Sequence, residues 1–172
     1  KAFLGCANLE DFLSNSLVSV GASAFEGCSD LSSMNTAKIS KYGNKAFANC
    51  TSLKTIYIAD GATIGTECFA DATALTTVTY GGSATLSKGS FKGCSALADI
   101  FLPTDAKDIP AELFNGCTAL KSIIIPSTIT AIGDGAFNGC TGLVNVEIPE
   151  SIKKMGEGIF ENCVFHVSDE PS

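Results

Sequence analysis

Phenylalanine recurs along this chain at a nearly constant interval, and this feature constrains the fold more than any other. The intervals are 22, 22, 22, 22, 23, 23 and 23 residues, for Phe3, Phe25, Phe47, Phe69, Phe91, Phe114, Phe137 and Phe160. Cysteine stands three residues after each phenylalanine except in one unit, which has Ala72. Leucine follows three residues later except in the last unit, which has His166. Such a repeat predicts a solenoid, in which each unit packs on its neighbours.

Each of these leucines opens a short segment in which apolar and variable residues alternate. In residues 120–125 and 143–148 the third and fifth residues after the leucine are apolar, and the fourth varies. This alternation predicts a strand with one buried face. We expect a single parallel sheet with strands near residues 53–58, 75–80, 97–102, 120–125 and 143–148, and shorter or irregular strands at 9–14 and 31–36.

The second half of each unit is rich in glycine and small residues. Residues 132–140 read IGDGAFNGC, and glycine follows the isoleucine position in five of seven units. The run is too short and too rich in glycine for a stable α-helix, so it predicts one helical or 3₁₀ turn on the outer side. Pro103, Pro126 and Pro149 follow the expected strands of the 23-residue units and are expected to end them.

These units predict one domain, residues 1–172. It would comprise a partial unit at 1–8, a tail at 166–172, and full units at 9–30, 31–52, 53–74, 75–96, 97–119, 120–142 and 143–165. The tail is polar and begins with His166, so we expect it to close the array or to begin a linker. Because residues 1–8 contain the end of a unit without its strand, we expect the chain to be a fragment of a longer protein.

The pattern L-x-x-I-x-I-P followed by I-G-x-x-A-F-x-x-C, clearest in residues 120–140 and 143–163, closely resembles the BspA-like leucine-rich repeat. The resemblance covers nearly the whole chain, although Ser14, Thr36 and Ser87 depart from the pattern. It implies a leucine-rich-repeat solenoid, a right-handed β/α superhelix with the sheet on its concave side and the short turns on its convex side. It also implies a cell-surface or secreted protein, in a family linked with adhesion to host matrix proteins and to other cells.

Charge and hydropathy exclude two classes of partner. The formal net charge is −7, with eleven lysines and no arginine, whereas electrostatic binding of nucleic acid needs a basic surface. The longest purely aliphatic run is residues 123–125, far too short to span a membrane. We therefore expect a protein partner, no nucleic acid and no direct membrane insertion.

The residues that could carry catalysis or bind a metal do not form a recognisable constellation. Seven of the eight cysteines hold one structural slot, so they are interpreted as packed free thiols in a row, whereas a metal needs ligands that converge on a point. Cys68 is interpreted as one more buried thiol. His166 is the only imidazole, and neither a nucleophile elbow nor a phosphate-binding loop is present. We expect no catalytic residues, no metal and no cofactor.

The outward positions of the expected strands differ from unit to unit, unlike the inward columns. The fourth position after the leucine carries Leu13, Asn35, Tyr57, Thr79, Phe101, Ile124 and Glu147. The candidate protein-binding residues are Tyr57, Thr79, Phe101 and Ile124, with Asp99 and Glu147 as an acidic rim. Isolated exposed apolar residues are also normal on any protein surface. We expect a non-enzymatic protein-binding or adhesion module that uses the concave sheet. A passive structural spacer, with recognition elsewhere in the parent chain, is the alternative, and an enzyme is the third possibility.

Overall fold

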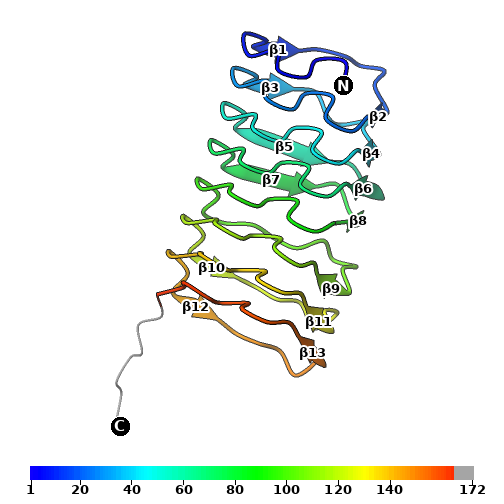
Figure 1. Ribbon diagram of the computed structural model, residues 1–172. Coiled ribbons are helices and arrows are strands. Elements are labelled where there is room, and N and C mark those ends of the chain that lie inside the picture. The colour runs from blue at the N-terminus through cyan, green and yellow to red at the C-terminus, as the bar shows by residue number, and fades with distance from the viewer. Residues whose placement is uncertain (165–172) are drawn as a thin grey trace.

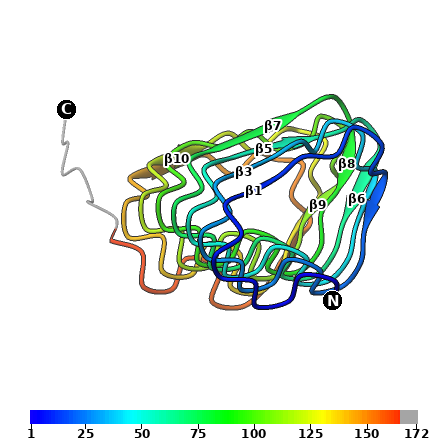
Figure 2. The same ribbon diagram turned by 90° about the horizontal axis from the view of Figure 1, so that it is seen from above.

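The computed structural model describes residues 1–164, which wind into a column of stacked coils (Figure 1). Viewed along the column, each coil has two sides that carry strands and a third side made of tight turns (Figure 2). We number the coils 1 to 7, beginning at Leu9, Leu31, Leu53, Leu75, Leu97, Leu120 and Leu143. The fold is therefore a parallel β-solenoid, as the repeat predicts.

The first side carries a ladder of parallel strands, which we call the first ladder. Its strands are β1 (Asp11–Phe12), β3 (Ser33–Met34), β5 (Thr55–Ile58), β7 (Thr77–Tyr80), β10 (Ser122–Ile123) and β12 (Asn145–Val146). The pairs are β1 with β3, β5 with β7, and β10 with β12. The expected strands at 53–58 and 75–80 are confirmed, and those of coils 1 and 2 are short, as predicted. The strands expected at 120–125 and 143–148 are also only two residues long, so the expected difference between these coils and coils 1 and 2 is wrong. The expectation at 97–102 is wrong, because that segment forms no strand.

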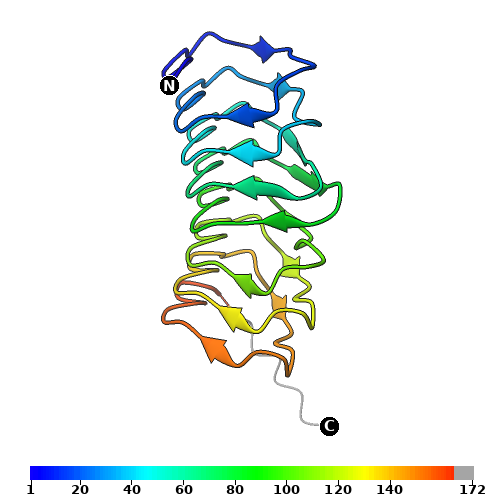
Figure 3. The ribbon, with the colours of Figure 1, turned by 90° about the vertical axis from the view of Figure 1, so that its right-hand side faces the viewer.

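The second side carries another parallel ladder, which we call the second ladder, where the sequence analysis expected only turns (Figure 3). Its strands are β2 (Ser19–Val20), β4 (Lys41–Tyr42), β6 (Ala62–Ile64), β8 (Ala84–Thr85), β9 (Asp108–Ile109), β11 (Ala131–Ile132) and β13 (Lys154–Met155). The expectation of a single sheet is therefore wrong. Segments of two or three residues are too short to show the alternation by which a strand is recognised in a sequence.

The third side consists of turns, and no helix occurs among residues 1–164, so the expected helical or 3₁₀ turns are wrong. In each coil the residues two before and two after the phenylalanine have positive φ, as with Lys45 (55°) and Asn49 (59°) around Phe47. A left-handed residue interrupts the run of right-handed residues that a helix needs. The amide of Phe47 instead donates to the carbonyl of Cys68 in the next coil at 2.8 Å.

The phenylalanine column forms a continuous stack inside the solenoid. Phe25, Phe47, Phe69, Phe91, Phe114 and Phe137 are all buried, as predicted. Their rings are nearly parallel, with neighbouring centroids 5.2 Å apart for Phe25 and Phe47 and 5.6 Å apart for Phe69 and Phe91. Because each ring contacts the rings above and below it, the core is continuous although each coil alone is too small to have one.

Glycine follows the second-ladder strand because the backbone of the preceding coil passes directly beneath it. A Cβ atom at Gly133 would lie 2.7 Å from the Cα atom of Ala111 and closer still to its amide nitrogen. The amide of Gly133 donates to the carbonyl of Ile109 at 2.8 Å. Close approach of the two chains, and not a positive φ, is therefore what glycine provides at this position.

Both ladders are interrupted between coils 4 and 5, and we call this interruption the seam. The strand β7 pairs only with β5, β8 only with β6, and β9 only with β11. Among the described residues, no backbone hydrogen bond joins residues 75–88 to residues 97–110. The seam coincides with the change from 22-residue to 23-residue units.

Prolines in coil 5 explain the seam. Pro110 occupies the position at which Gly133 donates an amide hydrogen bond to the preceding coil, and proline has no N–H group to donate. Pro103 likewise occupies the position equivalent to Gly81, whose amide donates to Ile58 at 2.8 Å. Ser87 adds a side chain to the glycine position of coil 4. Coil 5 therefore lacks an amide donor at one position of each ladder.

The turn side continues across the seam and joins the two halves of the column. Phe91 donates to the carbonyl of Leu113 at 3.1 Å, and the Phe91 and Phe114 rings stack at 6.1 Å. Glu112 also contacts Lys88 at 2.9 Å and Lys92 at 2.6 Å. These two hydrogen-bonded lysines lower the pKa of the Glu112 carboxyl group.

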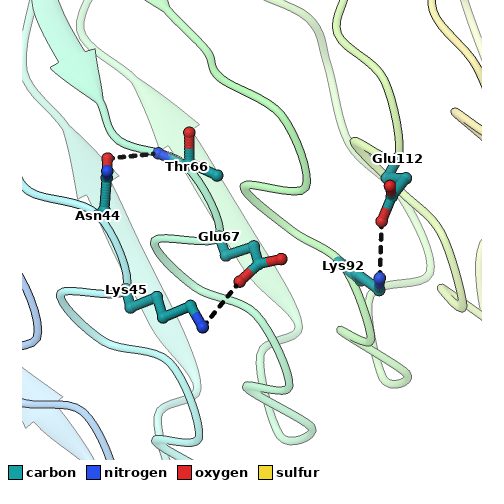
Figure 4. Close-up of polar contacts among 6 residues, drawn as sticks. All are labelled: Asn44, Lys45, Thr66, Glu67, Lys92 and Glu112. Atoms are coloured by element: carbon teal, nitrogen blue, oxygen red, sulfur yellow. Dashed lines mark hydrogen bonds and ion pairs between the residues drawn. The ribbon is translucent and has the colours of Figure 1, made fainter.

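Figure 4 shows the contact of Lys92 with Glu112 together with the ion pair of the N-terminal half. There Lys45 contacts Glu67 at 3.2 Å, and Asn44 accepts a hydrogen bond from the amide of Thr66 at 3.0 Å. Glu112 thus has two lysine partners at the seam, whereas Glu67 has one. Because these pairs are partly exposed, each contributes modestly to stability.

Candidate functional site

The first ladder presents the candidate binding residues to solvent. The exposed fractions are 42% for Tyr57 and 72% each for Phe101 and Ile124, and Thr79 is also exposed. The neighbours Ile56 and Ile58 are buried. The predicted inward and outward assignment along the strands is therefore right, including at Phe101.

The structure brings some of these residues together and separates others. Tyr57 and Thr79 are direct partners in the pairing of β5 with β7, and the tip of the Tyr57 ring packs over Gly81. Ile124 directly follows β10, in the C-terminal half. Phe101 lies across the seam from Thr79, in a segment without a strand. The row is thus divided between two half-arrays and is not one continuous ladder.

The centre of this row carries no charge, and its acidic flanks are solvated. Asp99 and Glu147 are exposed, as expected for a rim. The ion pairs found among residues 1–164 involve Glu67 and Glu112 on the turn side, and neither rim residue takes part in one. A partner could therefore contact the apolar row without displacing an existing ion pair.

Two features of this side were not among the candidate residues. Leu13, in the same outward row, is 82% exposed, more than any of the candidates, and its place in the row was the signal for it. A pocket of about 360 Å³ also opens at the seam, between residues 78–82 and residues 101–104. A pocket of similar volume, about 370 Å³, lies between coils 6 and 7 and is lined by residues within 122–127 and 145–149.

The cysteine column is buried from Cys28 to Cys140, as predicted, whereas Cys6 is exposed and Cys163 is partly buried. All eight cysteines are free, and the thiol of Cys140 donates to the carbonyl of Phe114 at 3.1 Å. Equivalent bonds join Cys50 to Phe25 and Cys94 to Phe69 at 3.1 and 3.2 Å. Burial raises the pKa of the Cys50 and Cys140 thiols to about 12, so both stay protonated at neutral pH. Such thiols are poor nucleophiles and poor metal ligands.

Alkaline pH is expected to destabilise the protein through these thiols. The folded pKa of Cys50 and of Cys140 lies above the ordinary value of 9.0, so their contribution to stability is complete below pH 9 and is lost as the pH rises towards 12. Urea unfolding followed by circular dichroism should show the free energy of unfolding falling through this range. The Cys140→Ala variant places in coil 6 the residue that Ala72 provides in coil 3, and its dependence on pH should be shallower.

Counting thiols provides the control for this prediction. In the native protein at pH 8 the exposed Cys6 should react at once, whereas the buried thiols should react only when the chain unfolds. In denaturant without a reductant, all eight should react. Fast reaction of many thiols in the native state, with no change of stability between pH 9 and 12, would contradict the assignment of the shift to burial.

Other candidate chemistry is absent from the described part of the chain. Residues 1–164 contain no group of three or more histidine, cysteine, aspartate or glutamate side chains placed to hold a metal ion. They also include no helical segment of the length and hydrophobicity that a bilayer span requires. His166, expected to close the array, lies outside the described residues.

Comparison with solved structures shows proteins with the same architecture. A leucine-rich cell surface protein of Faecalibacterium prausnitzii matches with a TM-score of 0.76 and 23% identity over 90% of this chain and 45% of that one. A leucine-rich repeat protein of Bacteroides ovatus matches with a TM-score of 0.70 and 29% identity over 92% of this chain and 48% of that one. The present chain thus spans about half the length of each.

Comparison with protein families agrees with these structures. A search of curated proteins found no significant match. The model of the BspA type leucine rich repeat region matches residues 1–97 and 59–167, with six copies of the repeat. Together these matches span nearly all of the sequence, and they include the columns of phenylalanine, cysteine and leucine described above. The chain belongs to the family of BspA type leucine rich repeat proteins.

Proposed function

We propose that this chain is a non-enzymatic protein-binding module of a cell-surface or secreted protein, and that it binds through the first-ladder side. The observation that carries the proposal is the row of exposed, uncharged residues on the first-ladder side, Tyr57, Thr79, Phe101 and Ile124. Large apolar side chains at the centre of a contact, with polar residues at its rim, are the usual anatomy of a protein interface. The cell surface protein of Faecalibacterium prausnitzii with the same fold supports the location.

The chemistry of the row favours a protein over other macromolecules. Tyr57 offers a rigid ring with one polar group, and Phe101 and Ile124 add apolar area without a charge that would have to lose its water. The net charge of −7 and the rim residues Asp99 and Glu147 favour a neutral or basic partner. Contacts of this size are weak per coil and gain strength through repetition or multivalency. Adhesion to a host matrix protein or to another cell is the role that fits these properties.

A passive spacer is the alternative function. The feature that favours it is the wealth of serine and threonine among the outward residues, for example Ser33, Thr55, Thr77 and Ser122. Such a surface is soluble but offers few anchors for a partner. If the chain is a spacer, no purified partner should bind it at all.

The test is a binding screen of the folded protein against purified host matrix proteins, with a triple variant on the row. Tyr57→Ser, Phe101→Ser and Ile124→Ser together should weaken binding by about tenfold or more, since residues of this type at the centre of an interface each cost upwards of 1 kcal/mol when truncated. The variant should stay folded, because these side chains lie outside the core.

A matched control removes exposed apolar residues that lie elsewhere. Leu4, Val18 and Met155 are about half exposed and are not in the row. Replacing these three by serine should leave binding unchanged. Equal loss in both triple variants would indicate non-specific hydrophobic adsorption, and a partner that ignores the row variant would place the binding site on another side of the solenoid.

A further inference from the structure

Gly81 on the first-ladder side stands at a position where no other coil has glycine. It lies two residues beyond Thr79, and the equivalent positions of the other coils carry Asn15, Ala37, Ala59, Pro103, Pro126 and Pro149. Gly81 is not among the glycines with positive φ, and it is exposed. Neither a left-handed backbone nor burial therefore accounts for the glycine.

The space in front of Gly81 is occupied by the ring of Tyr57, from the preceding coil. A Cβ atom at residue 81 would lie 3.1 Å from the Tyr57 Cζ atom and closer still to the Tyr57 hydroxyl oxygen. Because Tyr57 pairs with Thr79 in the register of β5 and β7, Gly81 is its diagonal neighbour, within reach of an aromatic side chain. The ring therefore leans onto coil 4 instead of standing out from the ladder.

Other apolar residues of the row, whose diagonal neighbours carry side chains, are far more exposed. Leu13, Phe101 and Ile124 are each at least 72% exposed, whereas Tyr57 is 42% exposed. The diagonal neighbours of these three residues in the next coil are Ala37, Pro126 and Pro149. The absence of a side chain at residue 81 thus accompanies the one large row residue that packs against the next coil.

We propose that Gly81 is a positioning residue for the binding row, because it leaves room for the Tyr57 ring and holds that ring in one orientation for a protein ligand. A side chain that is already fixed before binding loses less rotational freedom when the ligand arrives. A tyrosine ring offers a large apolar surface at a defined angle and a hydroxyl group at its tip. This inference rests on the proposed function, since it states how one residue of the row is prepared for its partner.

The test is the Gly81→Ala variant, measured with the matrix protein that binds the wild type most tightly in the screen above. The added methyl group takes the place of the ring tip, so the ring must turn outward. Binding should weaken about three- to tenfold, although the ring becomes more exposed. If exposed area alone decided binding, this variant would bind as tightly as the wild type or more tightly, and that result would overturn the proposal.

A second background separates the effect on the ring from an effect on the backbone. The methyl group of Gly81→Ala would also lie 3.1 Å from the amide nitrogen of Asp60. In the Tyr57→Ser background no ring remains to be displaced, so adding Gly81→Ala should leave binding unchanged. An equal loss of affinity in both backgrounds would assign the effect to the backbone and would overturn the positioning role.

Tyrosine fluorescence reports the orientation of the ring without any ligand. The chain has no tryptophan and three tyrosines, of which Tyr42 is buried and Tyr80 has a buried hydroxyl group. Quenching by acrylamide therefore reports mainly on Tyr57. The quenching constant should rise in Gly81→Ala while the circular dichroism spectrum stays that of the wild type. An unchanged quenching constant would show that Gly81 does not hold the ring.

The single variants distinguish failure of this proposal from failure of the proposed function. A matrix protein that loses affinity for Tyr57→Ser but binds Gly81→Ala as tightly as the wild type would reject the positioning role alone. The first-ladder side would then remain the binding face. Absence of binding to the wild type by every matrix protein would reject the proposed function, and this inference with it.

Discussion

Replacing Phe91 by alanine is expected to lower the free energy of unfolding by about 3–5 kcal/mol and to split unfolding into two transitions. Phe91 is buried and stacks on Phe69 at 5.6 Å and on Phe114 at 6.1 Å. At the seam neither ladder joins coil 4 to coil 5, so the turn side and its ring stack carry the connection. Removing the ring therefore leaves a cavity at the point where no ladder pairing joins the two halves.

The matched control for this prediction is Phe47→Ala. Phe47 is equally buried, but strands of the second ladder pair coil 2 with coils 1 and 3 on either side of it. Its loss should cost a similar free energy while unfolding remains a single transition, because nearest-neighbour coupling persists there. Differential scanning calorimetry separates the two results. A single transition for both variants, or mild losses for both, would show that the seam does not weaken the coupling.

Replacing Gly133 by alanine is expected to destabilise the protein by about 3 kcal/mol, at the upper end of the usual cost of overpacking. The new Cβ atom would lie 2.7 Å from the Cα atom of Ala111, and this neighbour is backbone, which cannot rotate away as a side chain can. Coils 5 and 6 would have to separate, which would weaken the hydrogen bond from the Gly133 amide to Ile109.

Gly21 is the control for this prediction, because it occupies the same position in coil 1, where a Cβ atom would meet nothing within 4 Å. Alanine there should be neutral or slightly stabilising, since it restricts the unfolded chain. Urea unfolding of both variants measures the difference. Similar effects of the two substitutions would mean that the solenoid absorbs the extra carbon by expanding, and the close approach of the coils would then not explain the glycine.

In coil 5 the glycine that follows the second-ladder strand is replaced naturally, by Pro110. It stands at the glycine position of coil 5, brings extra atoms to the contact and lacks the amide hydrogen. The second ladder is interrupted at this residue. The two halves stay joined on the turn side, where the Phe91 amide donates a hydrogen bond to the Leu113 carbonyl. Glu112 also contacts two lysines across the seam.

The parts of the structure that the sequence predicts are those that repeat in every coil. The columns of phenylalanine, cysteine and leucine point inward because apolar side chains leave water, and the seven-fold recurrence makes the register unambiguous. The same register places Tyr57, Phe101 and Ile124 outward, and their exposure follows from it. The packed state of Cys28, Cys50, Cys94, Cys117 and Cys140 also follows, since a slot that repeats along a solenoid faces the same way in successive coils, although Cys6 is exposed and Cys163 is partly buried.

The turns were predicted wrongly because their conformation depends on neighbouring coils. Lys45 and Glu67 have positive φ, which their residue types do not suggest. Each is held by a hydrogen bond from its amide to the next coil, to Thr66 at 2.9 Å and to Lys88 at 2.9 Å. Inter-coil bonds thus override the local preference for a helical turn.

What the sequence by itself determined is the solenoid, its buried columns and its exposed row. What only the tertiary structure decided is where strands pair, because pairing requires both partners to offer a donor and an acceptor at the right separation. The prolines at 103 and 110 are visible in the sequence, and Pro126 and Pro149 repeat the first of them in coils that remain paired. Only at coil 5, above the side chain of Ser87, are two amide donors missing together, and there both ladders are unpaired.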